Sequence, residues 1–362
     1  MSIDWLKKIK IDNFYMKNYK NILLINYGGI GDEILFLPTI SSVKKEYPDA
    51  KITLALEPRS KSIKNLVNSI DEVLCVDIKA QGFKKYFNVL NLIFTCWQKR
   101  FDCVISSGKS PLVAIILFLT FIKERIGYKS KTDFLLTKKV QLIENQYAAK
   151  MYHDLVKPII KNDYKDPEIE IFEEFILNPE FKKDEYICIH PGVSKMSISK
   201  NILKCPNIDF WQNLIKGLLN KNKQIVLLGT NDDKDLIEEI LKIKETKNNP
   251  NFINYFNKTK NILEMAFIMK NSKSVVCVDS APLHVAVSVG ANIFAIFGPT
   301  NEEKLIPQKE NITLIKSNCE CRPCLWHKRM QNCENSICLN IDYNLILDKI
   351  NWFWFGIIVE LS

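Results

Sequence analysis

The chain alternates short apolar, β-rich runs with longer amphipathic stretches, and this alternation most limits how it can fold. The runs are "NILLINY", "KITLALE", "EVLCVDI" and "DCVISS" in the first half and "YICIHPG", "QIVLLGT", "SVVCVDS" and "NIFAIFGPT" in the second. Apolar strands separated by helix-length segments are typical of parallel sheets covered by helices. We therefore predict an α/β fold with two parallel sheets, each in a Rossmann-like domain.

A charged segment separates the two sets of strands and marks the predicted domain boundary. Residues 161–186 contain two prolines and many Lys, Asp and Glu residues. We predict an N-terminal Rossmann-like domain over 1–165, a hinge over 166–184, a C-terminal Rossmann-like domain over 185–340 and a final segment over 341–362. In open α/β sheets ligands bind where strands end and helices begin, so motifs that follow strands are the candidate site.

The composition restricts the class of partner without choosing one. The 362 residues are 47% hydrophobic with a formal charge of +9, which suits a globular protein attracted to nucleotide phosphates, nucleic acid or an anionic membrane. Residues 1–20 lack the apolar core and cleavage site of a signal peptide, so we expect a cytoplasmic protein. The most apolar stretch, residues 111–122, is shorter than the roughly 20 residues that span a bilayer, and we interpret it as a buried helix.

The first residues of the chain combine apolar and basic side chains. Residues 5–10 read "WLKKIK". Such a segment forms either a short helix at a membrane interface or a solvated leader. Peripheral contact with a membrane is therefore kept as an expectation.

Three of the chain's 12 glycines stand within four positions, in the stretch "INYGGIGDEILFLP". Gly28, Gly29 and Gly31 follow the strand "ILLIN" and precede a helix that we expect to begin near Asp32. Glycines at such a turn permit positive φ and close approach of a ligand to the backbone. Asp32 lies where a helix N-terminus favours an ionised carboxylate, so it either caps the helix or accepts a proton from a substrate.

A second strand end, in "VCVDSAPLHVAVSVG", is predicted to bind an anion. The strand over 275–278 ends at Asp279 and Ser280, and a helix starts within the next two residues. Proline in the first turn and small residues before it leave backbone N–H groups facing outward, which suits a diphosphate. His284 lies on the first turn of this helix and either contacts a phosphate oxygen or is a satisfied structural histidine.

A third strand end, in "ICIHPGVSKMSISKN", places Ser194, Lys195 and Lys200 after a His-Pro-Gly turn. Lysines on such a loop either neutralise a phosphate or are ordinary solvated residues. Residues 295–300, "AIFGPT", form a fourth strand end with a Gly-Pro turn. No Asp-x-Asp pair follows a strand, so the sequence does not support a divalent metal at the reaction centre.

Taken in order, these segments resemble glycosyltransferase family 9, the ADP-heptose:lipopolysaccharide heptosyltransferases. The resemblance is carried from about residue 21 to about residue 350 by "GGIGDEILFLPTISSVKKEYPDAKITLAL", "RIGY", "IHPG", "DSAPLHVAVSVGANIFAIFGPT" and a late run of cysteines. It implies a GT-B fold, in which two Rossmann-like domains face each other across a cleft and the last helix, in 341–362, returns to the first domain. The implied activity is inverting, metal-independent transfer of a heptose or similar sugar from ADP-heptose to a phosphorylated lipid A–core acceptor.

The resemblance also implies roles for individual residues. Asp32 matches the proposed catalytic base, beside an acceptor loop of Gly28, Gly29 and Gly31. The predicted donor-binding residues are Ser194, Lys195, Lys200, Asp279, Ser280, Ala281, Leu283 and His284. The family usually has a Lys-Arg-Trp-Pro-type segment after His-Pro-Gly, and this chain does not. Lys200 is taken as the counterpart that contacts phosphate, with Lys195 and Lys204 as rivals, and Ala281 replaces a commoner glycine.

Five of the eleven cysteines fall between residues 319 and 338. Cys321, Cys324, Cys333 and Cys338 have the spacing C-x₂-C-x₈-C-x₄-C, and Cys319 is a fifth candidate. Four thiolates match a closed, structural site for zinc or iron, which leaves no open position for substrate. Packed thiols or redox pairs are the alternatives. A related group of protein heptosyltransferases holds iron with four such cysteines.

Other functions share some of these features. A nucleic-acid-binding protein with a zinc-ribbon-like cysteine run fits the net charge, but an aromatic RNA-binding signature is missing. Basic residues are concentrated only in "RPCLWHKR", so no nucleic acid is expected. A catalytically silent nucleotide-sugar binder, or a heptosyltransferase that modifies a protein, shares the motifs of the predicted enzyme.

Overall fold

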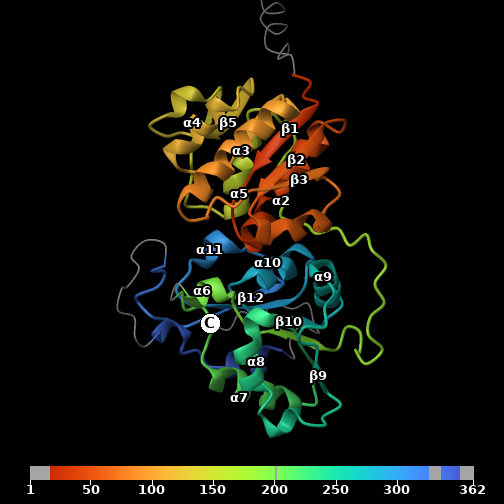
Figure 1. Cartoon of the computed structure of the whole chain (residues 1–362). Helices are drawn as coiled ribbons and strands as arrows, with labels where there is room; N and C mark the ends of the chain where they lie inside the picture. The colour runs from red at the N-terminus through yellow and green to blue at the C-terminus, as the bar shows by residue number, and fades with distance from the viewer. Residues whose placement is uncertain (1–16, 200–201, 326–335, 351–362) are drawn as a thin grey trace, which may run out of the picture.

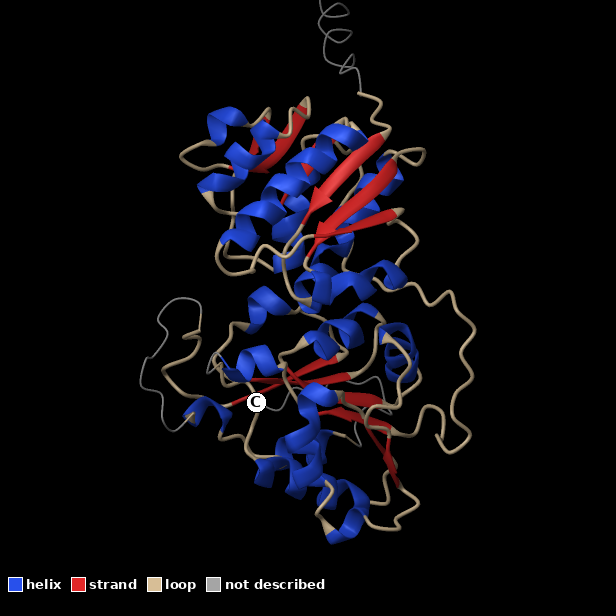
Figure 2. Ribbon diagram, viewed as in Figure 1, coloured by secondary structure: helices blue, strands red, loops and turns tan. Residues whose placement is uncertain are grey.

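The computed structural model describes residues 17–199, 202–325 and 336–350, which form two lobes stacked end to end (Figure 1). Each lobe contains a sheet with helices around it (Figure 2). The segment at residues 5–10 lies outside the described residues, so both of its alternatives, an interfacial helix and a solvated leader, stay open.

The first lobe is built on a six-stranded sheet in the order β3-β2-β1-β4-β5-β6, with all neighbouring strands parallel. Its strands are β1 (Asn21–Ile25), β2 (Lys51–Leu56), β3 (Glu72–Cys75), β4 (Cys103–Ser106), β5 (Glu124–Tyr128) and β6 (Lys138–Val140). Its helices are α2 (Ile30–Glu46), η1 (Pro58–Leu66), α3 (Phe83–Lys99), α4 (Pro111–Leu119), η2 (Asp133–Leu135), α5 (Ala148–His153) and η3 (Asp154–Val156).

The second lobe repeats this plan with the order β12-β11-β10-β7-β8-β9, again with all neighbours parallel. Its strands are β7 (Ile187–His190), β8 (Ile225–Leu227), β9 (Phe252–Asn254), β10 (Ser274–Val278), β11 (Ile293–Phe297) and β12 (Ile312–Lys316). Its helices are α6 (Lys195–Ser199), α7 (Ile208–Asn220), η4 (Asn231–Asp233), α8 (Lys234–Ile240), η5 (Lys244–Thr246), α9 (Ile262–Lys270), α10 (Ala281–Ser288), α11 (Glu302–Leu305), η6 (Ile337–Leu339) and α12 (Asn344–Lys349).

Both sheets reverse their strand order at equivalent places. The reversal lies between β1 and β4 in the first sheet and between β7 and β10 in the second. Ligands of doubly wound sheets bind at such switch points, beyond the carboxyl ends of the strands. The predicted α/β class with two parallel sheets is confirmed, and three of the four predicted motifs follow β1, β7 and β10, directly at the two switch points.

The lobes meet through a buried interface. One continuous group of buried apolar side chains extends from the first sheet into the second. Helices α2 and α10, one from each lobe, lie against each other where the lobes meet (Figure 1). Residues 157–186 form neither helix nor strand, and they are tied to both lobes: the Ile169 N–H donates to Ser288 O (3.1 Å) and the Glu170 N–H to Leu66 O (3.0 Å). The exact domain and hinge boundaries stay predictions.

The described part of the C-terminal segment packs on the second lobe. Leu347 of α12 fills the space beside Gly217 of α7, where a Cβ would lie 2.4 Å from Leu347 Cδ1. The Lys221 ammonium donates to Leu347 O at 2.8 Å. Residues 351–362 lie outside the described residues, so the predicted return of a last helix to the first lobe stays a prediction.

The prediction of a buried helix over 111–122 is wrong for one face of that helix. Helix α4 forms, and Ala114 and Leu117 are buried as expected. Leu112, however, is 64% exposed, and further apolar side chains of α4 face solvent with it. The predicted burial fails because, among the described residues, no element covers this side of the helix. Within the described residues, no helix combines the length and apolar character needed to cross a membrane.

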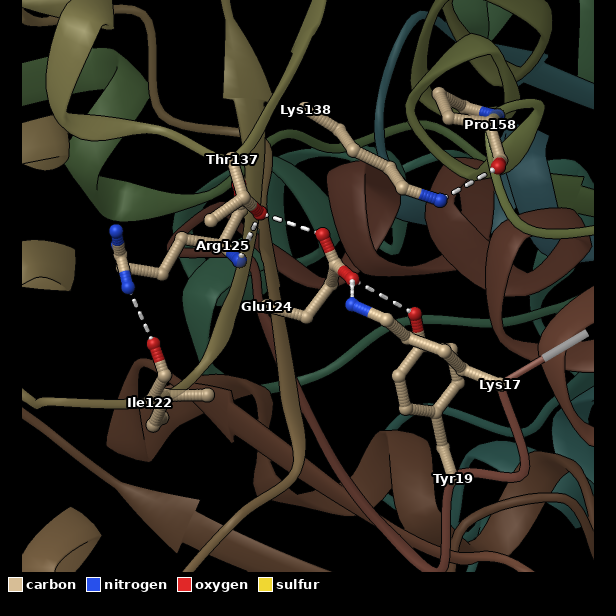
Figure 3. A network of polar contacts seen from close by, with 8 residues as sticks. All are labelled: Lys17, Tyr19, Ile122, Glu124, Arg125, Thr137, Lys138 and Pro158. Carbon is tan, nitrogen blue, oxygen red and sulfur yellow. Dashed lines mark hydrogen bonds and ion pairs between the residues drawn. The ribbon is translucent and has the colours of Figure 1, made fainter. Parts of the chain in front are cut away.

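A buried carboxylate, Glu124, lies at the amino ends of the strands of the first sheet, opposite to the carboxyl ends where the switch point opens. Glu124, at the start of β5, receives hydrogen bonds from Lys17 Nζ (2.5 Å), Tyr19 Oη (3.1 Å) and Thr137 Oγ1 (2.6 Å), as Figure 3 shows. Burial alone raises the pKa of Glu124, but these donors outweigh it and hold the pKa below its usual value. The ionised carboxylate therefore ties the residues before β1 to β5 and β6.

Candidate active site

Close packing explains two of the three glycines before α2. A Cβ on Gly28 would lie 2.2 Å from Asp32 Cβ, and a Cβ on Gly31 would lie 2.7 Å from Cδ2 of His284 in the other lobe. Around Gly29 a Cβ would meet only ordinary contacts, at 3.7 Å or more. Gly28 and Gly31 are therefore required because helix α2 and the opposing lobe both approach this turn closely.

The positive φ that these glycines permit is not used. Among the described residues, the glycines with positive φ are Gly82 and Gly290, and the N-cap Gly29 has an extended φ of −79°. Helix α2 begins at Ile30, two residues before the expected start. The turn needs no left-handed residue because the backbone passes directly from extended to helical geometry.

Asp32 is exposed and caps its own helix. Its Oδ2 accepts a hydrogen bond from the Gly29 N–H at 2.8 Å, so the capping role left open by the sequence is present. A carboxylate has a second oxygen, Oδ1, and the cap does not use it. The geometry thus allows the same side chain to hold the turn with one oxygen and to present the other.

A second acid, Glu33, lies beneath the turn and was missed by sequence reasoning. Its side chain is fully buried, and its Oε1 accepts from the Gly28 N–H at 3.2 Å. Burial raises the pKa of Glu33 to about 8, and the nearby Asp32 and Glu57 carboxylates add to the shift. Glu33 is therefore largely protonated at neutral pH. Its place as a Glu within an apolar helical run is the sequence signal that could have identified it.

The opposing turn begins α10 at Ala281, as predicted, with Ser280 as the N-cap. The Leu283 N–H donates to Ser280 O at 3.0 Å, and Pro282 has no N–H. The side chain of Leu283 is fully buried. The amides of Ser280 and Ala281 therefore carry most of the anion-binding capacity that the sequence assigned to the whole turn.

Lys204 reaches the end of β10. Its ammonium lies 2.7 Å from Oδ2 of Asp279, whose side chain is 3% exposed. Burial alone raises the pKa of Asp279, but the charge and hydrogen bond of Lys204 outweigh it and hold the pKa below its usual value. The buried carboxylate thus positions a lysine at the anion-binding turn. Sequence reasoning ranked Lys204 only as a rival of Lys200, which lies outside the described residues.

His284 is buried between the two turns. It is 6% exposed, and its Nδ1 has no hydrogen-bond partner among the described residues. Burial lowers the pKa of His284, more than the charges of Asp279 and Asp32 raise it. The imidazole is therefore neutral at pH 7, with one nitrogen still available to a ligand.

The loop after β7 is held to its own lobe. The Lys195 N–H donates to Asp232 Oδ2 at 3.2 Å, and Ser194 Oγ lies 3.1 Å from Ser197 Oγ at the start of α6. Arg59, from η1 of the first lobe, crosses to this loop and places Nη1 3.2 Å from Sδ of Met196. Sequence reasoning missed Arg59. Its place just after β2 and a proline, at another strand end, is the signal that could have marked it as a site residue.

A cavity of about 400 Å³ lies at the switch point of the first sheet. Asp32 takes part in its lining, together with polar residues after β1 and β4 and apolar residues of α3 and α4. The lining residues are Ile25, Asn26, Tyr27, Gly28, Asp32, Ile78, Val89, Leu92, Ser106, Ser107, Gly108, Lys109, Ser110, Val113, Ile116, Leu117 and Tyr152. This cavity has the size and mixed lining of a small-molecule site.

The cysteine run is described only in part. The Sγ atoms of Cys319 and Cys321 are 3.6 Å apart, and Cys338 is buried. Cys333 lies outside the described residues, and within them no three His, Cys, Asp or Glu side chains are close enough to hold a metal ion. The predicted four-cysteine site therefore stays a prediction.

Comparison with known proteins gives consistent matches. Residues 89–334 match the model of glycosyltransferase family 9 (heptosyltransferase). The chain is 27% identical over 297 residues to lipopolysaccharide heptosyltransferase 3 of Escherichia coli K12, covering 78% of this chain and 83% of that protein. It is 20% identical over 309 residues to lipooligosaccharide heptosyltransferase 2 of Haemophilus influenzae, covering 82% of this chain and 88% of that protein.

The solved structure of E. coli ADP-heptose lipopolysaccharide heptosyltransferase II superposes with a TM-score of 0.70 at 17% identity, covering 92% of this chain and 98% of that one. This likeness confirms the GT-B fold.

Proposed function

The chain belongs to glycosyltransferase family 9, and on this premise we propose that it transfers a heptose or similar sugar from an ADP-activated donor to a lipopolysaccharide core acceptor. The names of the curated relatives support a heptose and a lipopolysaccharide or lipooligosaccharide acceptor, and the name of the superposed E. coli enzyme supports ADP-heptose as the donor. The observation that carries the proposal is the contact between Gly31 and His284, because it brings the Asp32 turn and the anion-binding turn of α10 together. We propose the cytoplasm as its location.

Asp32 is the proposed catalytic base. Its Oδ2 stays on the Gly29 N–H, while Oδ1 accepts the proton of the acceptor hydroxyl. The hydroxyl oxygen then forms a bond to the anomeric carbon as the bond from that carbon to the diphosphate oxygen breaks. Attack from the face opposite to the diphosphate inverts the configuration, through an oxocarbenium-like transition state.

The second lobe is proposed to stabilise the departing diphosphate. The amides of Ser280 and Ala281 at the start of α10 and the ammonium of Lys204 supply the positive potential. The neutral His284 donates a hydrogen bond to a phosphate oxygen through the nitrogen that has no protein partner. The predicted donor contacts of Ser194, Lys195 and Lys200 are kept as part of this proposal.

The cavity at the first switch point is the proposed acceptor site. It extends from Asp32 to α3 and α4, so a hydroxyl held there reaches the carboxylate. Its polar part, at Asn26, Ser106 and Ser107, suits the hydroxyl groups of a sugar. Arg59 adds a cation beside the turn, with Nη2 3.7 Å from where a Cβ on Gly29 would lie, which suits a phosphorylated acceptor.

A panel of nucleotide sugars tests the donor assignment. The purified chain is titrated with ADP-, GDP-, UDP- and dTDP-linked sugars while its melting temperature is followed. We expect ADP-heptose to raise the melting temperature most, because at equal concentrations the ligand that binds the native state most tightly stabilises it most. Equal shifts with all four nucleotides, or none with ADP-heptose, contradict the assignment.

Turnover separates an enzyme from a silent nucleotide-sugar binder. Purified lipid A–core with ADP-heptose should give a heptosylated product and free ADP. Binding of ADP-heptose with no transfer to lipid A–core, but with transfer to a polypeptide, indicates the protein-modifying alternative. Binding with no transfer to either acceptor indicates the silent binder.

We also propose that Cys321, Cys324, Cys333 and Cys338 hold a structural zinc or iron ion. The 3.6 Å between the sulfurs of Cys319 and Cys321 exceeds the S–S bond of about 2.05 Å and is close to the ~3.8 Å expected between two thiolates of a tetrahedral zinc site. Cys319 therefore competes for one ligand position. Elemental analysis of anaerobically purified protein should give one metal per chain, reduced in Cys321→Ser; metal-free wild-type protein contradicts the proposal.

A further inference from the structure

Helix α3 carries two apolar stripes, and only one of them packs on the protein. Leu92, Ile93 and Cys96 are buried against the sheet. The other stripe recurs at positions i, i+3, i+4, i+7, i+11 and i+14 and faces solvent, with exposed fractions from 48% at Trp97 to 92% at Phe83. Its members are Phe83, Tyr86, Phe87, Leu90, Phe94 and Trp97. A helix normally has polar residues on its outer side, so this second stripe is unusual for a free surface.

Helix α4 continues the same surface. Figure 1 shows α3 and α4 as neighbours in the first lobe. Trp97 joins them: its Nε1 donates to Leu119 O at 3.0 Å, and its ring stacks on Phe121 with centroids 5.9 Å apart. We call the combined surface the aromatic face, defined by the α3 stripe together with Leu112, Ile115, Phe118, Leu119 and Phe121.

The charges that helices α3 and α4 themselves carry have one sign. Helix α3 contains three lysines and no acidic residue, and α4 contains no charged residue. Over residues 79–123 the one acid is Asp102, whose carboxylate accepts from the backbone amides of Lys20 and Asn21. The basic residues of this range are Lys79, Lys84, Lys85, Lys99, Arg100, Lys109 and Lys123. Three of them, Lys79, Lys99 and Lys109, form ion pairs with Glu57, Glu72 and Glu144 of other segments.

We propose that the aromatic face docks the protein on an anionic phospholipid bilayer. Phe and Leu side chains insert at the boundary of the acyl chains, Trp and Tyr favour the headgroup level, and lysines pair with lipid phosphates. Charge complementarity selects the bilayer over a second copy of the chain. A two-fold dimer brings the same patch against itself, which sets the exposed Lys84 and Lys85 of α3 against the same residues of the second copy.

The position of the aromatic face relates it to the proposed acceptor site. The same two helices line the cavity at the first switch point, through Val89 and Leu92 of α3 and Val113, Ile116 and Leu117 of α4. Docking here brings that cavity to the membrane surface, where a lipid-anchored acceptor lies. This consequence rests on the proposed function, but the docking itself does not.

Sedimentation of the full-length chain with vesicles, in the absence of any sugar or nucleotide, tests the docking. Phosphatidylcholine vesicles are compared with vesicles that also contain phosphatidylglycerol. We expect binding to the anionic vesicles, weakened by salt because exposed charges are screened. Binding of the wild-type chain to neither vesicle, or equally to both and unaffected by salt, overturns the proposal.

Three variants assign the binding to this surface. Phe83→Ser/Phe87→Ser/Leu90→Ser should lower the partition coefficient about tenfold or more, and Lys84→Glu/Lys85→Glu should lower it on anionic vesicles only. The matched control is Phe172→Ser/Ile176→Ser, two exposed apolar residues of the interlobe segment, which should bind as the wild type does. All the altered residues are exposed, so melting temperatures should stay close to the wild-type value.

Two outcomes contradict the assignment to the aromatic face. One is vesicle binding by the Phe83/Phe87/Leu90 variant that equals wild-type binding. The other is a concentration-dependent dimer of the wild-type chain that this variant abolishes while vesicle binding is unchanged, which would identify the face as a self-association surface. Because no substrate is present, neither outcome depends on the transferase activity.

Discussion

The Cβ that Gly31 lacks would lie 2.7 Å from Cδ2 of His284, although the two residues belong to different lobes. Gly31→Ala should therefore push the lobes apart at the two functional turns, while alanine itself favours helix α2. We expect a loss of transfer rate of about tenfold or more, because small displacements of reacting groups are costly, with little change in melting temperature. Gly29→Ala, where the nearest atom is 3.7 Å away, is the comparison; equal losses at both positions contradict this explanation.

The Lys204–Asp279 pair should behave as a unit in unfolding experiments. Lys204→Met leaves a buried carboxylate without its counter-charge and should cost about 3–5 kcal/mol of unfolding free energy. Adding Asp279→Asn removes that charge and should restore most of the loss, without restoring transfer. Urea denaturation of the two variants measures both effects, and a Lys204→Met protein as stable as the wild type would show that the pair is not buried as described.

Glu33 should make the protein less stable as pH rises. Its pKa is raised to about 8 by burial, so above the ordinary pKa of 4.5 the unfolded chain ionises while the native chain stays protonated. Stability therefore falls between about pH 4.5 and pH 8. Glu33→Gln keeps an acceptor for the Gly28 N–H and should gain on the order of 2 kcal/mol at pH 8 and little near pH 4.5. The gain is measured by thermal unfolding at both pH values, and a gain that does not depend on pH contradicts the buried, protonated state.

Glu124 should act in the opposite direction. Its pKa is held below the usual value by its hydrogen-bond donors, so it stabilises the native state above the ordinary Glu pKa, and this contribution is lost as pH falls. Glu124→Gln should lower stability at pH 7 by about 1–3 kcal/mol and flatten the acid side of the stability curve. Because the residue lies at the sheet edge opposite to the switch point, transfer at a temperature well below melting should be unchanged. A stable Glu124→Gln variant with the wild-type acid profile argues against the network in Figure 3.

Sequence reasoning predicts the framework of this protein well. Strand ends and helix starts are local features, so α10 begins at Ala281 as expected and α2 begins within two residues of Asp32. The pairing of the two turns followed from the family resemblance and the shared sheet architecture. The glycines before α2 do not use the positive φ that they permit. Glycine also serves where another element approaches closely, and no local pattern reveals which element that is.

What the sequence does not predict depends on tertiary neighbours. The raised pKa of Glu33 comes from burial under the turn, and the reach of Arg59 to Met196 comes from the stacking of the lobes. Helices α3 and α4 show the same limit. Their apolar stripes have helical spacing on both sides, and only the folded structure shows that Phe83 and Leu112 lie on the uncovered sides.

The central claim is that Asp32 acts as a base in addition to capping its helix, and single-turnover transfer by Asp32→Asn tests it most directly. Asparagine keeps an oxygen that accepts from the Gly29 N–H but has no carboxylate to take a proton. We predict a rate lower by about 10²–10⁴-fold, with ADP-heptose affinity and melting temperature retained, and additional loss of stability only in Asp32→Ala. Transfer by Asp32→Asn at the wild-type rate would show that the residue is a helix cap and that another group removes the proton.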